Sequence, residues 1–202
     1  MVLRNISFSY DKNNLVLNNF CFDFSRKGIS YILIGPNGCG KTTILKIITS
    51  LIKDYKGEVI NDTYKKIRAN FTSYGLDPSK TGRKNVGMLE IEKNRDFKKL
   101  IEYYGDRLNM KKNLNKKVSR MSSGMQLKTK LILMFSAESD LLIFDEPVNP
   151  LDSNSVVEFF SIINELNERG TSCIMSMHLN HITSLDSILR KDILNLDLLV
   201  EK

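Results

Sequence analysis

The fold of this 202-residue chain is decided at Gly35-Pro36-Asn37-Gly38-Cys39-Gly40-Lys41-Thr42-Thr43. The stretch matches the pattern G-x-x-x-x-G-K-[ST], and it follows a buried apolar run at Ile29–Ile34 and opens a helical pattern. Glycines let the backbone curl so that its N–H groups face one anion, and the start of the following helix adds positive partial charge. The stretch therefore predicts a phosphate-binding loop between a buried strand and a helix.

Individual side chains of the loop have separate expected roles. Lys41 is expected to neutralise β- and γ-phosphate oxygens, and the Thr42 hydroxyl is expected to ligate Mg²⁺. Cys39 is either a thiol that a bound phosphate shields or an unreactive small filler. We expect nucleotide contacts along the whole loop, from Gly35, Pro36, Asn37, Gly38, Cys39, Gly40, Lys41, Thr42 and Thr43.

Two acids follow the second buried run, Leu141–Phe144. In an open α/β sheet, ligands collect at the carboxyl ends of the strands, which is where Asp145 and Glu146 stand. Asp145 suits a second Mg²⁺ contact, and Glu146 suits the general base that polarises the attacking water. The alternative, in which both acids only end a strand or cap a helix, loses weight beside the glycine loop.

The order of the remaining patterns predicts an α/β protein. Residues 2–34 alternate as strands, and residues 41–52 have one apolar helical face that includes Leu51 and Ile52. A helix at Ser153–Arg169 and a strand at Thr171–Ser176 follow the second buried run. We expect one domain over 1–202, with a parallel-sheet core and an N-terminal antiparallel part at about 1–75 and 140–202. A helical subdomain is expected at about 76–139.

The composition is that of a soluble globular chain, with 42% hydrophobic residues and a net charge of +7. No apolar run reaches the roughly 18–20 residues that cross a bilayer, and residues 1–6 lack the organisation of a secretory signal. The three cysteines are too far apart for a zinc site or a disulfide framework. Lysines are spread along the chain, so we expect no nucleic-acid partner.

The stretch Arg120-Met121-Ser122-Ser123-Gly124-Met125-Gln126 resembles the signature motif of ABC-family ATPases, most often Leu-Ser-Gly-Gly-Gln. Ser122 and Gly124 match, whereas Met121, Ser123 and Met125 replace the other positions. Taken alone, such a stretch is more often a helix cap than a ligand site. The order of the motifs supports the resemblance, because Asp145-Glu146 follow the signature and Asn149-Pro150-Leu151-Asp152 then resembles the family's D-loop.

Further positions match the family less specifically. His178 ends a strand and resembles the switch histidine that touches the γ-phosphate. The alternative interpretation is a buried histidine whose ring nitrogens are hydrogen-bonded within the protein. Tyr10 stands where the family places an aromatic residue against adenine, and it could equally be a half-buried strand tyrosine. His181 has no assigned role and is expected on the surface.

The resemblance implies the family's ATP-driven mechanism. Two copies would associate head to tail, with ATP and Mg²⁺ between the phosphate loop of one and Ser122, Ser123 and Gly124 of the other. One departure affects the Q-loop, because residues 71–78 contain no glutamine. Either water replaces that side chain, or Ser73, Tyr74 or Asp77 does.

These features predict the ATPase subunit of a transporter, which lies in the cytoplasm on the inner face of the membrane beside a membrane-spanning subunit. The second ATPase subunit is either an identical or a different chain. The short chain resembles small exporter ATPases, including the haem-exporter subunit, so export is expected. The alternative is a soluble ABC ATPase that acts in iron–sulfur assembly, translation or DNA repair.

Overall fold

A computed structural model describes residues 1–11, 14–71, 75–87 and 96–178, together with the backbone of 191–195. The chain divides into two compact units. Unit 1 comprises Met1–Ala69, Ser139–Glu146 and Ile163–Lys202, and unit 2 comprises Asn70–Glu138 and Pro147–Ile162. The predicted domain limits at about 75 and 140 remain a prediction.

Unit 1 contains a three-stranded antiparallel sheet in the order β2-β1-β4. Its strands are β1 (Val2–Ser9), β2 (Leu15–Asp23) and β4 (Lys56–Ile60). The predicted strict alternation breaks inside β1, where Leu3 and Ile6 are both buried. The register shifts between these two residues, and Asn5 has a φ of 50°, so a local irregularity turns Ile6 back to the core.

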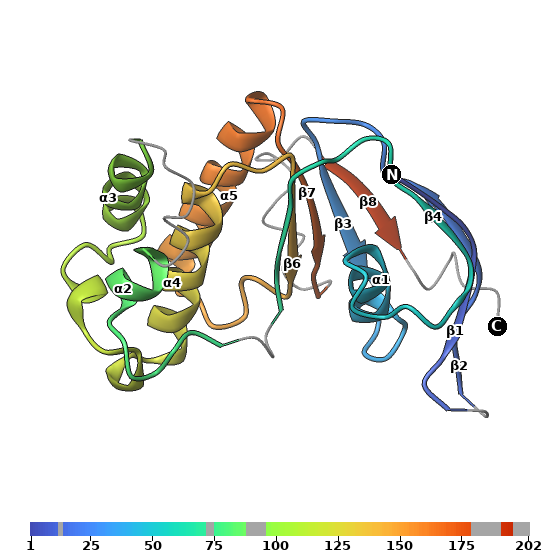
Figure 1. Ribbon diagram of the computed structural model, residues 1–202, viewed down its shortest axis with the longest axis horizontal. Coiled ribbons are helices and arrows are strands. Elements are labelled where there is room, and N and C mark those ends of the chain that lie inside the picture. Colours follow the sequence, from blue (N-terminus) through green and yellow to red (C-terminus); the bar gives the residue numbers. More distant parts are fainter. Residues whose placement is uncertain (12–13, 72–74, 88–95, 179–190, 196–202) are drawn as a thin grey trace. The chain divides into compact units, whose positions relative to one another are not determined.

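The second sheet of unit 1 has five strands in the order β5-β6-β7-β3-β8 (Figure 1). They are β3 (Ser30–Ile34), β5 (Ile67–Asn70), β6 (Leu141–Asp145), β7 (Ser172–Ser176) and β8 (Lys191–Asn195). The pairs β6–β7, β7–β3 and β3–β8 are parallel. Every residue of β3 and β7 is buried, as expected for central strands of a covered parallel sheet.

Helix α1 (Lys41–Ile48) follows β3 and packs on β6 and β7 through Ile44, Leu45, Ile47 and Ile48. The predicted apolar face continued to Leu51 and Ile52, but this extension is wrong. The helix ends at Ile48 with Thr49 as its C-cap, Ser50 adopts a φ of 58°, and Leu51 is 47% exposed. A left-handed residue cannot continue an α-helix, so the apolar pattern outlasts the helix by one turn.

Unit 2 is mostly helical (Figure 1). It contains α2 (Gly82–Gly87), α3 (Phe97–Arg107), α4 (Ser123–Ser136), two 3₁₀ turns at Asn113–Asn115 and Val118–Arg120, and the first part of α5 (Ser153–Glu168). Aromatic contacts fill its core, because Phe135 lies 5.5 Å from Tyr104 and 6.0 Å from Phe159 between ring centroids. The parallel sheet, the antiparallel part and the helical unit confirm the predicted α/β fold class.

Within the described parts of the chain, no helix is both long enough and apolar enough to cross a bilayer.

Candidate functional site

The glycine-rich loop connects the end of β3 to the start of α1, as the sequence predicts (Figure 1). Gly38 and Gly40 have φ values of 84° and 99°, in the left-handed region that favours glycine. A Cβ atom at Gly40 would lie 2.8 Å from the Leu17 side chain, whereas one at Gly38 would meet nothing within 4 Å. Gly40 is therefore required for both conformation and packing, and Gly38 for conformation alone.

Lys41 is buried at the centre of this loop, with 6% of its surface exposed. Its Nζ atom donates hydrogen bonds to the carbonyl oxygens of Gly35 (2.7 Å) and Pro36 (2.9 Å). The loop thus holds an ammonium group over its own backbone. A phosphate group placed there would meet a fixed positive charge and the N–H groups of a helix N-terminus.

Asp145 forms hydrogen bonds both to α1, the helix that follows the glycine-rich loop, and to the end of β7. Its Oδ1 atom accepts hydrogen bonds from the Thr42 hydroxyl (2.8 Å) and the Ser176 hydroxyl (2.8 Å). Thr42 and Asp145 are therefore brought together as predicted. Ser176 was missed by sequence reasoning, although its place at the carboxyl end of a buried strand, two residues before His178, is a usable signal.

Glu146 follows Asp145 in a strained conformation, with a φ of 52°. A non-glycine residue in this region costs about 1–3 kcal/mol, so its surroundings must hold it there. The Glu146 backbone N–H donates to the Ser176 hydroxyl at 3.0 Å, and the Glu146 carboxylate lies 3.1 Å from His178 Nε2. Both side chains are about one-third exposed, so this acid and this imidazole are accessible to solvent.

Tyr10 comes directly after β1 and is 61% exposed. Its hydroxyl lies 3.1 Å from Thr43 Oγ1 in α1, and its ring stands edge-on to Phe8 with centroids 4.8 Å apart. The hydroxyl is thus tethered beside the phosphate loop, while much of the ring remains exposed. The adenine contact stays a prediction that this geometry permits.

The oxygen atoms of Thr42 and Asp145 fit a magnesium ion. Mg²⁺ prefers oxygen ligands and is usually held by one or two protein groups together with substrate phosphates. Among the described residues, no group of three or more His, Cys, Asp or Glu side chains gathers to form an all-protein metal site. A site that shares the ion with phosphate oxygens is therefore the arrangement that these residues suit.

The predicted signature residues lie in unit 2 at the start of α4. Ser122 is the N-cap residue of this helix, and its hydroxyl accepts a hydrogen bond from the Met125 backbone N–H at 3.3 Å. A Cβ atom at Gly124 would lie 2.7 Å from the Pro150 carbonyl oxygen, so glycine allows these backbones to approach. Gln126 is engaged too, because its amide donates to the carbonyl oxygens of Val118 and Met121.

Asp152 caps α5 within the same unit. Its Oδ1 atom accepts hydrogen bonds from the Ser155 backbone N–H (2.9 Å) and hydroxyl (2.8 Å), and its Oδ2 atom pairs with Lys128 Nζ of α4 at 2.9 Å. The hydrogen bond from Lys128 is the largest cause that holds the pKa of Asp152 well below its ordinary value, and the hydrogen bonds from Ser155 add to it. Asp152 therefore links the predicted D-loop to the signature helix.

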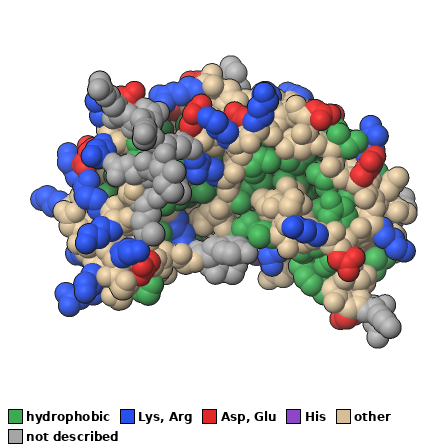
Figure 2. Space-filling view, viewed as in Figure 1, with side chains coloured by type: hydrophobic (Ala, Val, Ile, Leu, Met, Phe, Trp, Pro, Cys, Tyr) green, Lys and Arg blue, Asp and Glu red, His purple; other side chains and the backbone are tan. Residues whose placement is uncertain are grey.

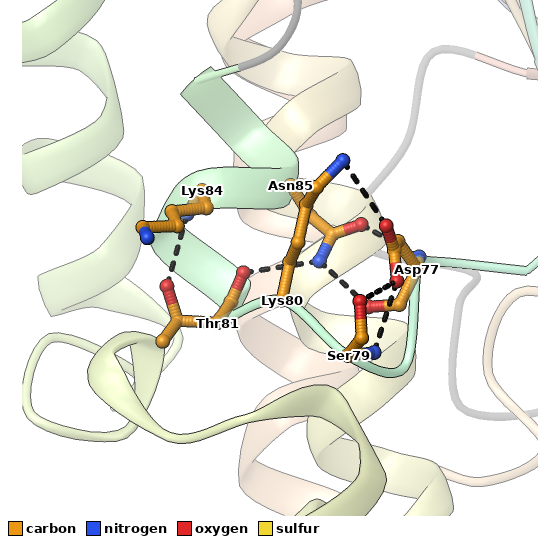
Figure 3. Close-up of polar contacts among 6 residues, drawn as sticks. All are labelled: Asp77, Ser79, Lys80, Thr81, Lys84 and Asn85. Atoms are coloured by element: carbon orange, nitrogen blue, oxygen red, sulfur yellow. Dashed lines mark hydrogen bonds and ion pairs between the residues drawn. The ribbon is translucent and has the colours of Figure 1, made fainter.

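Only part of the predicted Q-loop lies within the described residues. Ser73 and Tyr74 lie outside them, as does His181. Asp77 is engaged locally, because its carboxylate accepts hydrogen bonds from Ser79 and pairs with Lys80 at 3.1 Å (Figure 3). These contacts lower the pKa of Asp77 to about 2. A role for Asp77 in place of the missing glutamine would require these contacts to break, and it remains a prediction.

The fold and the glycine-rich loop together define the general class of this protein. A parallel α/β sheet with a glycine loop after β3, a buried lysine and an Asp–Glu pair at the end of β6 is typical of a P-loop nucleoside-triphosphate-binding protein. The family model described as ABC transporter matches residues 17–149. The chain therefore belongs to the ABC transporter family, as one of its ATP-binding, ATP-hydrolysing domains.

Individual relatives agree with this family. The zinc import ATP-binding protein ZnuC of Rickettsia conorii is 33% identical over 167 residues, which cover 82% of this chain and 70% of that protein. The zinc uptake system ATP-binding protein ZurA of Listeria innocua is 26% identical over 91% of this chain and 81% of its own length. A dimeric ATP-binding cassette in a post-hydrolysis state, bound to ADP and Pi, superposes with a TM-score of 0.82 at 22% identity. That alignment covers all of this chain and 96% of the cassette, and at this identity it shows the fold.

Proposed function

We propose that this chain binds and hydrolyses Mg-ATP to drive a transporter whose membrane-spanning part is a separate polypeptide. The observation that carries the proposal is the convergence of Thr42, Asp145, Glu146, Ser176 and His178 beside the phosphate loop. These groups supply the positioning and electrostatic stabilisation on which phosphoryl transfer depends.

Each group has a distinct proposed task. Lys41 exchanges its carbonyl partners for phosphate oxygens, and the loop N–H groups hold the same phosphates. Thr42 and Asp145 hold Mg²⁺, which when bound neutralises charge on the phosphate oxygens. Glu146 accepts a proton from the attacking water, and His178, 3.1 Å away, orients that carboxylate and reaches the γ-phosphate.

The signature residues are proposed to act on ATP bound by a second copy. Ser122, Ser123 and Gly124 begin a 14-residue helix, and the N–H groups at such a helix start favour an anion. Two copies arranged head to tail would enclose ATP between the phosphate loop of one and this helix start of the other. Asp152 then acts as a D-loop residue that ties the signature helix to α5. ATP binding would close such a dimer and hydrolysis would open it.

The direction of transport is proposed to be import. We expected export from the shortness of the chain, but the comparisons do not support that direction, because the ZnuC and ZurA relatives are named for zinc import and uptake. By the same likeness, a metal ion is the proposed class of substrate. Among the curated relatives compared, this chain spans between 54% and 81% of their length. The properties of the complete relatives therefore enter here only as support.

The experiment that tests this proposal is isolation of the chain from the native membrane in mild detergent. A multi-span membrane protein should copurify in constant proportion. Vesicles that carry the complex with this chain on their inner face should accumulate external zinc only when ATP is present inside. Recovery on ribosomes or DNA instead, with no membrane protein present, would favour the soluble ABC ATPase over a transporter. Such recovery would also contradict the proposed place of the chain on the inner face of the membrane.

A further inference from the structure

The hydroxyl of Ser176 holds two residues of the candidate site at once. It accepts a hydrogen bond from the Glu146 backbone N–H at 3.0 Å, and it donates one to Asp145 Oδ1 at 2.8 Å. The same carboxylate oxygen also accepts a hydrogen bond from the Thr42 hydroxyl at 2.8 Å. A single chain of hydrogen bonds therefore runs from the backbone of Glu146 through Ser176 to Asp145 and on to α1.

The register of the sheet places this hydroxyl. β6 and β7 are parallel, and Asp145 pairs with Ser176. On the other side of β7, Ser176 pairs with Leu33 of β3, and the backbone N–H of the next residue, Met177, donates to Leu33 O at 3.0 Å. The end of β7 is thus held between two strands. Since neighbouring side chains of a strand point to opposite faces, a shift of one residue would put a methionine in place of the serine.

Ser176 is fully buried in apolar surroundings. None of its surface is exposed, and the neighbouring Phe144, Met175 and Met177 are each exposed by 1% or less. Figure 2 shows hydrophobic side chains gathered over the part of the molecule that carries α1 and the parallel sheet. A hydroxyl in such surroundings has to find its partners within the protein, and this one uses its proton for Asp145 and a lone pair for Glu146. It therefore fixes both groups without competition from bulk water.

Glu146 is the residue of the site that most needs such support. Its φ of 52° lies in the left-handed region, which residues other than glycine seldom adopt. Ser176 holds its backbone N–H, and His178, two residues further along the chain, lies 3.1 Å from its carboxylate. The end of β7 therefore holds Glu146 both at the backbone and at the side chain.

We propose that Ser176 is a positioning residue for the general base of ATP hydrolysis. Its hydroxyl keeps the Glu146 backbone in the left-handed conformation, with Asp145 as the anchor, so that the Glu146 carboxylate stays directed at the attacking water. The inference rests on the proposed function, because it requires Glu146 to be the base. Hydrolysis should therefore depend on Ser176, whereas nucleotide binding, which Lys41 and the loop N–H groups provide, should not.

The test compares Ser176→Ala with Ser172→Ala in the full chain. Ser172 is equally buried at the opposite end of β7, and its hydroxyl accepts a hydrogen bond at 2.9 Å from the N–H of Gly28, which also has a positive φ (69°). Ser176→Ala should lose about 10- to 100-fold in turnover at saturating Mg-ATP, the range typical when a hydrogen bond behind a metal ligand is removed. Its nucleotide affinity should be unchanged. Ser172→Ala should keep wild-type turnover, because it loses the same buried hydroxyl away from the site.

Two further measurements show whether Ser176 acts through Glu146. Hydrogen exchange of the Glu146 backbone amide, followed by NMR on the nucleotide-free chain, should be at least about tenfold faster in Ser176→Ala than in wild type or Ser172→Ala. In the Glu146→Gln chain, where the base is already absent, adding Ser176→Ala should change the residual turnover by less than about threefold.

Conservative variants complete the test. Ser176→Thr retains the hydroxyl and should restore turnover to within about threefold of wild type. If Ser176→Ala does not fold, Ser176→Cys takes its place in every assay, because a thiol is close in shape and forms only weak hydrogen bonds.

The possible results separate this inference from the proposed function. Wild-type turnover or wild-type Glu146 amide exchange in Ser176→Ala, while Glu146→Gln is inactive, would overturn the positioning role and leave Glu146 as the base. An equal loss of turnover in Ser172→Ala would also overturn it, because any lost buried hydroxyl would then have the same effect. So would a full additional loss in the double variant, since Ser176 would then act independently of Glu146. Wild-type turnover in Glu146→Gln would instead contradict the proposed base itself.

Discussion

The substitution Glu146→Gln separates ATP binding from ATP hydrolysis. An amide has the size of the carboxylate and leaves the Glu146 backbone N–H bonded to Ser176, so the strained conformation should persist. The lost pairing with His178 involves side chains about one-third exposed, and such pairs contribute up to about 1 kcal/mol to stability. Removal of a general base slows a reaction about 100- to 10,000-fold, which corresponds to about 2.7–5.5 kcal/mol in the barrier.

The assay is phosphate release at saturating Mg-ATP, together with a separate measurement of nucleotide affinity. We expect the variant to bind ATP with wild-type affinity, to lose turnover as stated, and to accumulate a dimer on size exclusion when ATP is present. Glu168→Gln, at the exposed end of α5, is the matched control and should behave as wild type. Turnover within about threefold of wild type at unchanged affinity would show that Glu146 is not the base.

Three further predictions follow from the described contacts. Ser122→Asp keeps a residue that caps helices but places a negative charge toward ATP of the second copy, so melting temperature should hold while turnover falls at least about 100-fold. Asp152→Ala should lower the free energy of unfolding by about 1–2 kcal/mol. Because the pKa of Asp152 is depressed, its stabilisation is complete above pH of about 4 and is lost as pH falls below that value; urea titrations of Asp152→Asn should show a weaker acid dependence than wild type. Thiol labelling of Cys39 should be blocked by Mg-ATP, whereas the exposed Cys21 should react equally in both states.

The sequence was sufficient for the elements that form around the phosphate loop. Uniform burial of β3 and β7 leaves continuous apolar runs, and the step from such a run through glycines to a helical period is specific. The predicted strand end at Asp145 and helix start at Ser153 coincide with the structure for the same reason. Local pattern and tertiary environment agree at these places.

Elsewhere the decisive contact joins residues that are distant in sequence. Ser176 becomes a partner of Asp145 only when β6 and β7 pair, and no local pattern reports that pairing. Leu51 continued the apolar period beyond a helix end that Ser50 imposes through its backbone.

The most direct test of the central mechanism is a structure of the Glu146→Gln chain with Mg-ATP. Two copies should enclose two nucleotides, with Lys41 of one copy and Ser122 of the other on the same γ-phosphate. A nucleotide held by Lys41, Thr42 and Asp145 of one copy, with Ser122 facing solvent in every assembly, would contradict the head-to-tail mechanism and leave a nucleotide-binding domain that works alone.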